Sequence, residues 1–142
     1  RLKMPLRTAK QSTTYIIGED GAAVTLTAAF SGNVVSFPTE MYDGMKLYID
    51  YTPVQNGREC TIQAEYSPDG TNYYIDTVES QESTGNSDLL SWQGTVIGAT
   101  ASTSYKRAYR VPVDSSYVRI SVKEDGVATF GTAVIQAEFK IN

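Results

Sequence analysis

Nucleophilic and acid–base catalysis both need a reactive side chain beside a proton acceptor, and this chain has no histidine to serve as one. Zinc sites of the usual cysteine and histidine types are excluded for the same reason. The single cysteine, Cys60, occupies an apolar position in an alternating segment, so we expect a small buried side chain without an internal disulfide. Serine and threonine are abundant in turn-like segments, but no Gly-x-Ser-x-Gly motif occurs. The sequence therefore predicts that the chain is not an enzyme.

Carboxylates are the remaining side chains with catalytic or metal-binding potential. Glu65 and Glu138 occupy matching places in two similar segments and could form the paired acids of a glycosidase. Both fall on the face opposite the apolar residues, so we expect them to face solvent or a neighbouring subunit. Residues 19–21, 67–72 and 124–126 are rich in oxygen, but none has the spacing of a calcium loop, and Asp-Gly is typical of turns. We expect no metal and no cofactor.

The strands that would position these side chains are clearest in the middle of the chain. Residues 47–51 and 60–66 each alternate between apolar and polar side chains, which predicts two half-buried strands. Residues 53–57 between them read Pro-Val-Gln-Asn-Gly, a turn sequence, so the pattern predicts a β-hairpin. A second turn at residues 67–72 leads to a predicted strand through residues 73–75, which would extend the hairpin into a meander.

The whole chain predicts an all-β fold in one domain. Further strands are predicted at residues 13–17, 24–28, 91–97, 105–111, 117–123 and 132–141. Residues 31–43 are too irregular to assign, residues 79–88 contain no apolar side chain and form a loop, and no helix is predicted. About eight short strands favour a two-sheet antiparallel β-sandwich, with jelly-roll or immunoglobulin-like topology. Residues 12–142 form this domain, and residues 1–11 form an N-terminal arm.

One short segment recurs in the sequence. Residues 62–66 read Ile-Gln-Ala-Glu-Tyr and residues 135–139 read Ile-Gln-Ala-Glu-Phe, each after an alternating strand. Either the two sheets use similar hairpins, with the turn of the second starting at residues 124–126, or strands of like composition resemble one another by chance. Two copies are too few for a solenoid or a propeller.

Charge is divided unevenly along the chain. The first ten residues carry only cations, Arg1, Lys3, Arg7 and Lys10, whereas the net charge of the whole chain is −4. This division favours contacts between the basic arm of one copy and the acidic body of another, although a solvated tail without a target fits as well. The acidic body argues against nucleic acid as a partner, and no apolar segment is long enough to span a membrane. Because residue 1 is not Met, we expect a segment to precede it.

Aromatic residues provide the candidate interaction surface. The chain holds ten Tyr, four Phe and one Trp, and we select Tyr48, Tyr73, Tyr74 and Trp92 because aromatic side chains are enriched at protein interfaces. Aromatic faces also stack on sugars and on single-stranded nucleic acid. We expect the aromatic residues to divide between the sandwich core and an interface between copies of the chain.

Residues 47–53 and 60–74 resemble small β-sandwich proteins of tailed bacteriophages, in which a strand, a polar loop and a strand ending in Ser-x-Asp-Gly-x-x-aromatic recur. Residues 109–113, 117–122 and 133–139 fit the same outline. The resemblance implies a virion structural protein, such as a head decoration, cement or tail-associated protein. Its partners would be copies of itself and other virion proteins.

The turn at residues 66–73 is also similar to a turn of discoidin-like carbohydrate-binding domains. That resemblance implies a secreted glycan-binding module, with Trp92 or an exposed tyrosine as the platform for the sugar. The chain departs from the family because it lacks the disulfide that often joins the termini and shows no basic and aromatic sugar-binding loops.

Overall fold

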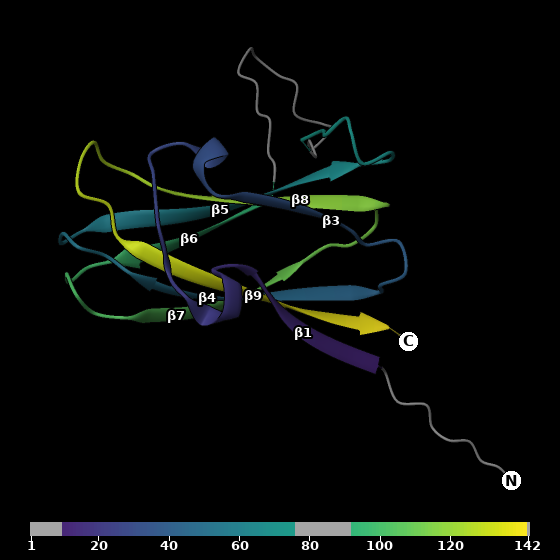
Figure 1. Cartoon of the computed structure of the whole chain (residues 1–142), viewed down its shortest axis with the longest axis horizontal. Coiled ribbons are helices and arrows are strands. Elements are labelled where there is room, and N and C mark those ends of the chain that lie inside the picture. Colours follow the sequence, from purple (N-terminus) through teal and green to yellow (C-terminus); the bar gives the residue numbers. More distant parts are fainter. Residues whose placement is uncertain (1–9, 76–91, 142) are drawn as a thin grey trace, which may run out of the picture.

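The computed structural model describes residues 10–75 and 92–141 and shows two antiparallel sheets stacked face to face (Figure 1). Sheet A contains β1 (Lys10–Ile17), β2 (Val24–Thr25), β4 (Gly44–Thr52), β7 (Tyr105–Val111) and β9 (Thr132–Ile141). Sheet B contains β3 (Val34–Pro38), β5 (Arg58–Ser67), β6 (Trp92–Gly98) and β8 (Tyr117–Glu124). The only helical turns described are of the short 3-10 type, η1 (Glu19–Gly21) and η2 (Phe30–Gly32). The predicted all-β sandwich is confirmed.

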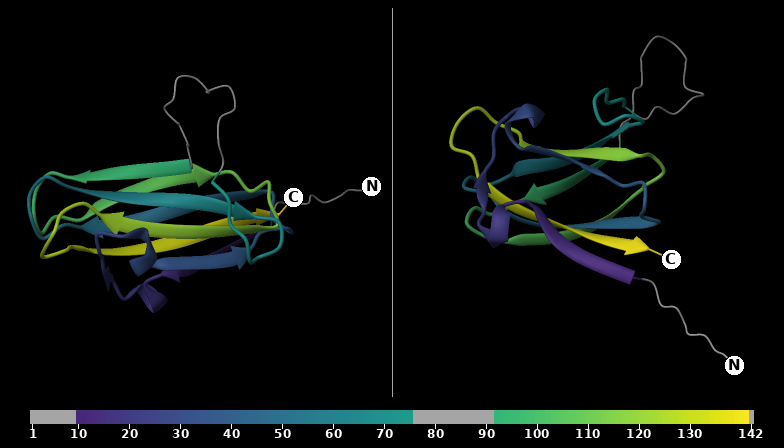
Figure 2. Two further views of the ribbon diagram at one scale, coloured as in Figure 1. Left: turned by 90° about the horizontal axis from the view of Figure 1, so that it is seen from above. Right: turned by 45° about the vertical axis from the view of Figure 1, so that its right-hand side comes forward.

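The order of the strands is that of a jelly roll. Sheet A runs β1-β9-β4-β7, with β2 beside β9, and sheet B runs β3-β8-β5-β6. The pairs are nested, because β1 pairs with β9, β3 with β8, β4 with β7 and β5 with β6. Nested pairs wrapped into two sheets define the jelly roll, one of the two topologies that the sequence left open. The views in Figure 2 show the two layers from above and from one side.

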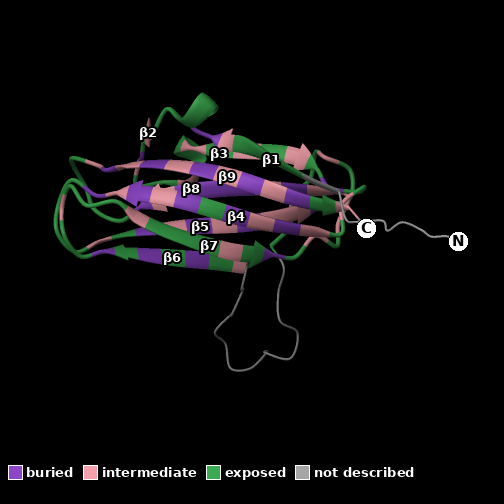
Figure 3. Ribbon diagram, turned by 90° about the horizontal axis from the view of Figure 1, so that it is seen from below, coloured by how far each residue is buried: buried purple, intermediate pink, exposed green. Residues whose placement is uncertain are grey.

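The core lies between the sheets, and strand alternation fills it (Figure 3). Each central strand points one row of side chains into the core. In β4 and β9 each row contains four buried apolar residues, namely Met45, Leu47, Ile49 and Tyr51 in β4 and Ala133, Ile135, Ala137 and Phe139 in β9. Cys60 is fully buried in β5 and is a free thiol, as predicted. Within the described residues no helix is long and apolar enough to cross a membrane.

The predicted hairpin between residues 47–51 and 60–66 is wrong. β4 pairs with β7 and β9 in sheet A, whereas β5 pairs with β6 and β8 in sheet B. Both strands are central and have a neighbour on each side, so neither has a free edge for the other. The turn residues serve a crossing between sheets, in which the Gly57 amide donates to the Gly98 carbonyl (2.8 Å) and the Ser102 amide to the Pro53 carbonyl (2.8 Å).

Three other expectations are corrected. The turn that starts at residues 124–126 is also a crossing, from β8 in sheet B to β9 in sheet A. The meander and the strand at residues 73–75 do not form, because Tyr74 makes only an isolated bridge to Tyr66 in the described part of the chain. The unassigned segment 31–43 contains β3, while β2 is shorter than the strand predicted there. The polar loop predicted at residues 79–88 lies outside the described residues.

The recurring segment reflects a two-fold relation between the sheets. Ile135 lies 73 residues after Ile62, and Val122 lies 73 residues after Ile49, while Ile62 pairs with Val122 and Ile135 pairs with Ile49. The sheet orders correspond in the same way, since β1-β9-β4-β7 matches β6-β5-β8-β3. The similar segments are therefore central strands of two equivalent halves, each entered by a crossing.

Candidate functional site

On one side of the sandwich, the edge strand of sheet A is protected against pairing with another chain. β7 forms this edge and exposes Lys106, Arg107 and Arg110. Charged side chains along an edge strand disfavour the approach of a second strand. We therefore do not expect β7 to extend its sheet into a neighbouring molecule.

The adjoining edge of sheet B is covered by Tyr109 of β7. The Tyr109 hydroxyl donates to the Thr95 carbonyl in β6 (3.1 Å), and its ring lies edge-on to Trp92 with the ring centroids 5.7 Å apart. A Cβ on Gly94 would lie 2.7 Å from the Tyr109 ring, so this approach depends on glycine. Trp92 is half-buried and packs against the core, so only part of its surface is exposed.

On the opposite side of the sandwich, β1 forms the edge of sheet A without such protection. Within the described chain β1 pairs only with β9, and its residues from 11 to 17 carry no charge. The side chains of residues 12–15 are all exposed. Two exposed acids, Glu19 and Asp20, follow directly in η1. After Lys10, the β1 edge therefore carries no charge, and it ends beside an acidic turn.

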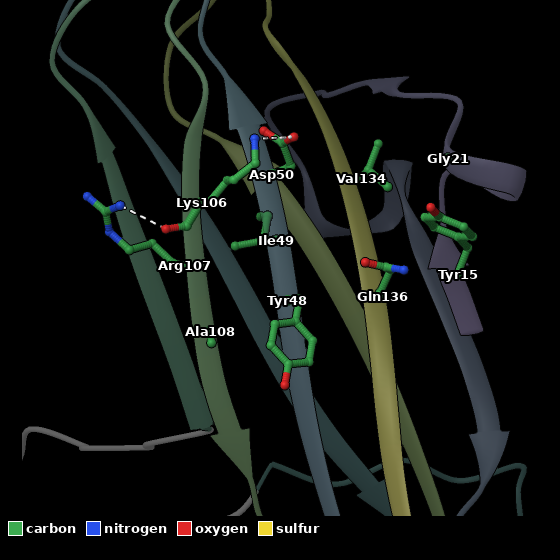
Figure 4. A pocket seen from close by; sticks show the side chains of 10 residues that line it. All are labelled: Tyr15, Gly21, Tyr48, Ile49, Asp50, Lys106, Arg107, Ala108, Val134 and Gln136. Atoms are coloured by element: carbon green, nitrogen blue, oxygen red, sulfur yellow. Dashed lines mark hydrogen bonds and ion pairs between the residues drawn. The ribbon is translucent and has the colours of Figure 1, made fainter. Parts of the chain in front are cut away.

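The outer face of sheet A contains a hollow of about 480 Å³ (Figure 4). Gln136 and Val134 of β9 and Ala108 of β7 form its floor. Tyr15 of β1 and Tyr48 of β4 flank Gln136 because both are in register with it, and they expose 43% and 36% of their surface. We call this surface the sheet A hollow, and the residues that line it include Tyr15, Tyr48, Asp50, Lys106, Val134 and Gln136.

Opposite charges at one wall of the sheet A hollow neutralise each other. Lys106 Nζ donates to Asp50 Oδ2 (3.1 Å) and to Ser104 Oγ (2.9 Å), and the Ser104 hydroxyl donates to Asp50 Oδ1 (2.5 Å). The ion pair is exposed to solvent, so it contributes at most about 1 kcal/mol to stability. Its main effect is to leave this wall with donors and acceptors but no net charge.

The tyrosine and the amide at the centre of the hollow differ in their partners. The Tyr48 hydroxyl donates to Glu138 Oε1 (2.7 Å), and this hydrogen bond raises the pKa of Tyr48. Lys46 Nζ lies 5.8 Å from the centroid of the Tyr48 ring. The side-chain amide of Gln136 has no hydrogen-bond partner among the described residues. Gln136 therefore presents a donor and an acceptor to whatever enters the hollow.

A second polar cluster is buried where the two crossings meet. The Glu124 carboxylate, which the sequence placed in a turn, is fully buried and accepts hydrogen bonds from the Tyr51 hydroxyl and the Gly131 amide (2.8 Å). Arg58 Nη1 lies 3.8 Å from Glu124 Oε1. Burial and the bond to Glu124 raise the pKa of Tyr51. No buried side-chain polar atom in the described residues lacks a partner, so this cluster joins β4 to β8 and leaves nothing for a ligand.

The aromatic residues selected from the sequence lie on different faces. Tyr48 lies on the outer face of sheet A, whereas Tyr73 lies beside Arg119 on sheet B, with the guanidinium carbon 4.3 Å from its ring centroid. Tyr74 is 59% exposed next to Tyr73. Trp92 packs at the covered side of the sandwich. The structure therefore does not gather these four residues into one patch.

The remaining predicted residues belong to the basic arm. Arg1, Lys3 and Arg7 lie outside the described residues, and Lys10 is the first residue of β1. Tyr15 and Gln136 were not predicted from the sequence to belong to the site. Both occupy outward positions of strands, but only the register of β1, β9 and β4 brings them beside Tyr48.

The two carboxylates considered for glycoside hydrolysis lie on opposite outer faces. Glu65 Oε1 accepts a hydrogen bond from Arg119 Nε (3.0 Å) on sheet B, whereas Glu138 is bound by Tyr48 on sheet A. A glycosidase needs its two carboxyl groups within about 10 Å, on either side of one bond. In residues 10–75 and 92–141, no group of three or more metal-ligating side chains could hold a metal ion.

The oxygen-rich turn at residues 67–72 is a turn, as predicted. The amides of Thr71 (2.8 Å) and Asn72 (2.9 Å) donate to Asp69 Oδ1, and the Ser67 hydroxyl also reaches it (2.9 Å). The amide of Asn72, followed by that of Thr71, holds the pKa of Asp69 well below its usual range. These local bonds account for the Asp-Gly sequence without a metal.

In comparisons with known proteins, no family model, curated protein or solved structure matches this chain. The β1 edge and the sheet A hollow are the two surfaces that combine exposure with specific chemistry.

Proposed function

We propose that this chain is a non-enzymatic structural protein of a virion, of the decoration or cement type, which packs in a repeated lattice with copies of itself. The observation that best supports the proposal is the contrast between the two sides of the sandwich. β7 exposes three cations and its Tyr109 covers part of β6, whereas β1 carries no charge after Lys10 and is exposed from Ser12 to Tyr15. Soluble β proteins usually protect their edges, so an open edge favours a partner strand.

The charges around β1 suit a second copy of the chain as that partner. If two β1 strands pair antiparallel about a two-fold axis, the basic sequence that precedes β1 in one copy, which includes Arg7, is directed towards the acidic turn that follows β1 in the other, which includes Glu19. The two-fold axis makes both contacts equivalent, so each copy contributes its arm and its acidic turn.

Lattice packing gives such contacts their strength. An exposed ion pair contributes about 0.2–1 kcal/mol, which is too little to hold an isolated dimer by itself. In a repeated assembly many weak contacts act together, and their combined avidity exceeds that of any one of them. The virion setting rests on the resemblance of residues 47–53 and 60–74 to phage β-sandwich proteins.

The test combines the mass of the purified chain in solution with electron microscopy of its mixtures with particles of the phage that encodes it. We expect self-association that weakens with salt, and density at regular positions on the particle. Arg7→Glu and Glu19→Arg should each weaken self-association by about 2- to 30-fold, the range for two symmetric ion pairs, and the double variant should restore it. Ala108→Lys, at an exposed position of the protected β7 strand, is the matched control and should change nothing.

The outcomes separate the parts of the proposal. A chain that stays monomeric at every concentration and binds no particle would overturn the structural role. Self-association that the Arg7 and Glu19 variants leave unchanged would retain the role and reject pairing through β1.

A further inference from the structure

We propose that the sheet A hollow binds an uncharged saccharide. The hollow lies on the face of the sheet rather than at its edge, so this proposal goes beyond assembly and does not depend on it. The observation behind this proposal is that Tyr15, Gln136 and Tyr48 lie in one row across three neighbouring strands (Figure 4).

The shape of the hollow suits a sugar ring. Tyr15 and Tyr48 stand on β1 and β4 with β9 between them, which separates their backbones by about 10 Å, twice the spacing of neighbouring strands. The floor between them is formed by Gln136, Val134 and Ala108, and Ala108 is too short to fill the space. A volume of about 480 Å³ falls in the range of small-molecule sites.

The chemistry of the lining suits the two kinds of surface that a sugar presents. Exposed faces of Tyr15 and Tyr48 can stack against its C–H groups. Its hydroxyls can bind the Gln136 amide, which has no other partner among the described residues, and the Asp50 carboxylate, whose lone pairs are only partly used. Lys106 adds donors at the same wall.

The charges of the hollow favour a neutral ligand over an anionic one. Asp50 and Lys106 form an ion pair at 3.1 Å, so neither is left to bind a charged group alone. Glu138 lies beyond Tyr48 and accepts its hydroxyl, which keeps a further negative charge next to the site. Arg107 projects away from the hollow and donates to the backbone carbonyl of Lys106 (Figure 4). The Asp50–Lys106 pair and the neighbouring Glu138 therefore make the hollow less favourable for a phosphate or a uronate than for a neutral sugar.

The experiment is a ¹H–¹⁵N NMR and calorimetric titration of the purified chain with defined tetrasaccharides. The probes are the neutral oligomers of glucose, galactose, mannose and N-acetylglucosamine, with an oligogalacturonate as the anionic counterpart. We expect at least one neutral probe to shift the amides around Tyr15, Tyr48 and Gln136, and the oligogalacturonate to bind at least about tenfold more weakly.

Variants distinguish stacking in the hollow from attachment elsewhere. Tyr15→Ala and Tyr48→Ala should each lower the affinity by about tenfold or more, while Tyr48→Phe, which keeps the ring, should retain it. Tyr74→Ala removes a more exposed tyrosine from another face and serves as the control. Thermal unfolding of each variant establishes that it is folded.

Three results would overturn the saccharide site. One is the absence of any shift with all neutral probes at millimolar concentration. Another is a loss of affinity in Tyr74→Ala as large as in Tyr48→Ala. The third is tighter binding of the oligogalacturonate than of every neutral probe.

Discussion

Replacing Tyr51 by phenylalanine should destabilise the protein more than its single lost oxygen suggests. The Tyr51 side chain is fully buried, and phenylalanine keeps its ring and most of its packing. The lost hydroxyl is one of two hydrogen-bond donors that reach the buried carboxylate of Glu124, the other being the Gly131 amide. No water can replace it without opening the core, so Glu124 is left with an unsatisfied oxygen in a dry site.

The expected cost follows from the charge of the acceptor. Hydrogen bonds to ionised groups contribute about 1.5–3 kcal/mol, and a buried charged acceptor without its partner costs at least as much. We therefore expect Tyr51→Phe to lower the free energy of unfolding by about 2–3 kcal/mol, or the melting temperature by about 4–12 °C for a domain of this size. Urea denaturation at pH 7 measures it as a lower midpoint with an unchanged m value.

Tyr109→Phe is the matched control for this prediction. The Tyr109 hydroxyl donates to a neutral carbonyl, that of Thr95, near the surface, so its removal should cost about 0.5–1.5 kcal/mol. A loss of stability in Tyr51→Phe no larger than in Tyr109→Phe would contradict this expectation. It would mean that the Glu124 carboxylate does not depend on the phenol.

Three further predictions concern the same core. Burial, with the charge of Glu124, raises the pKa of Cys60 from 9.0 to about 12, so at alkaline pH the folded chain keeps a proton that the unfolded chain loses. The stability that this proton contributes should be complete below pH 9.0 and should fall by about 1.4 kcal/mol per pH unit as the pH rises towards 12. Urea midpoints between pH 8 and 11 measure the decline. The raised pKa of Tyr51 acts with the same sign above pH 10, so Tyr51→Phe should flatten this alkaline decline; an equal slope in both proteins would contradict it. Gly94→Ala should cost about 1–3 kcal/mol because its Cβ would meet the Tyr109 ring at 2.7 Å, whereas Gly44→Ala, with its nearest atom at 3.8 Å, should melt close to the parent protein.

The strands of this fold were predictable from the sequence, but their partners were not. Alternation located β4 and β5 and their buried faces, because burial of one face belongs to each strand by itself. The connection at residues 53–57 suits a hairpin and a crossing equally well, since Pro and Asn-Gly specify backbone angles and not the sheet that follows. The deciding neighbours, β9 for β4 and β8 for β5, come from much later in the chain.

The residues of the candidate surface were likewise only partly predictable from the sequence. Tyr48 is identified from the sequence as an exposed aromatic residue, and it lies in the sheet A hollow. Tyr15 and Gln136 become its neighbours only through the register of three strands. Trp92 has the residue type of a stacking platform, but the glycine at position 94 lets a neighbouring tyrosine cover that side of the sandwich. Residue type therefore identified candidate binding residues, but the pairing of the strands determines which of them lie on one surface.

The two-fold relation between the sheets explains why the sequence similarity between the halves is interrupted. Glu124 lies 73 residues after Tyr51, so the two residues occupy equivalent positions in the two halves. Their side chains are joined by the hydrogen bond from the Tyr51 hydroxyl to the Glu124 carboxylate. Two ionised carboxylates at these positions would repel each other, and two phenols would leave Arg58 without its buried anion. One position must donate and the other must accept. The recurring Ile-Gln-Ala-Glu segment lies in two strands of different sheets, where like residues satisfy like environments, and there the similarity persists.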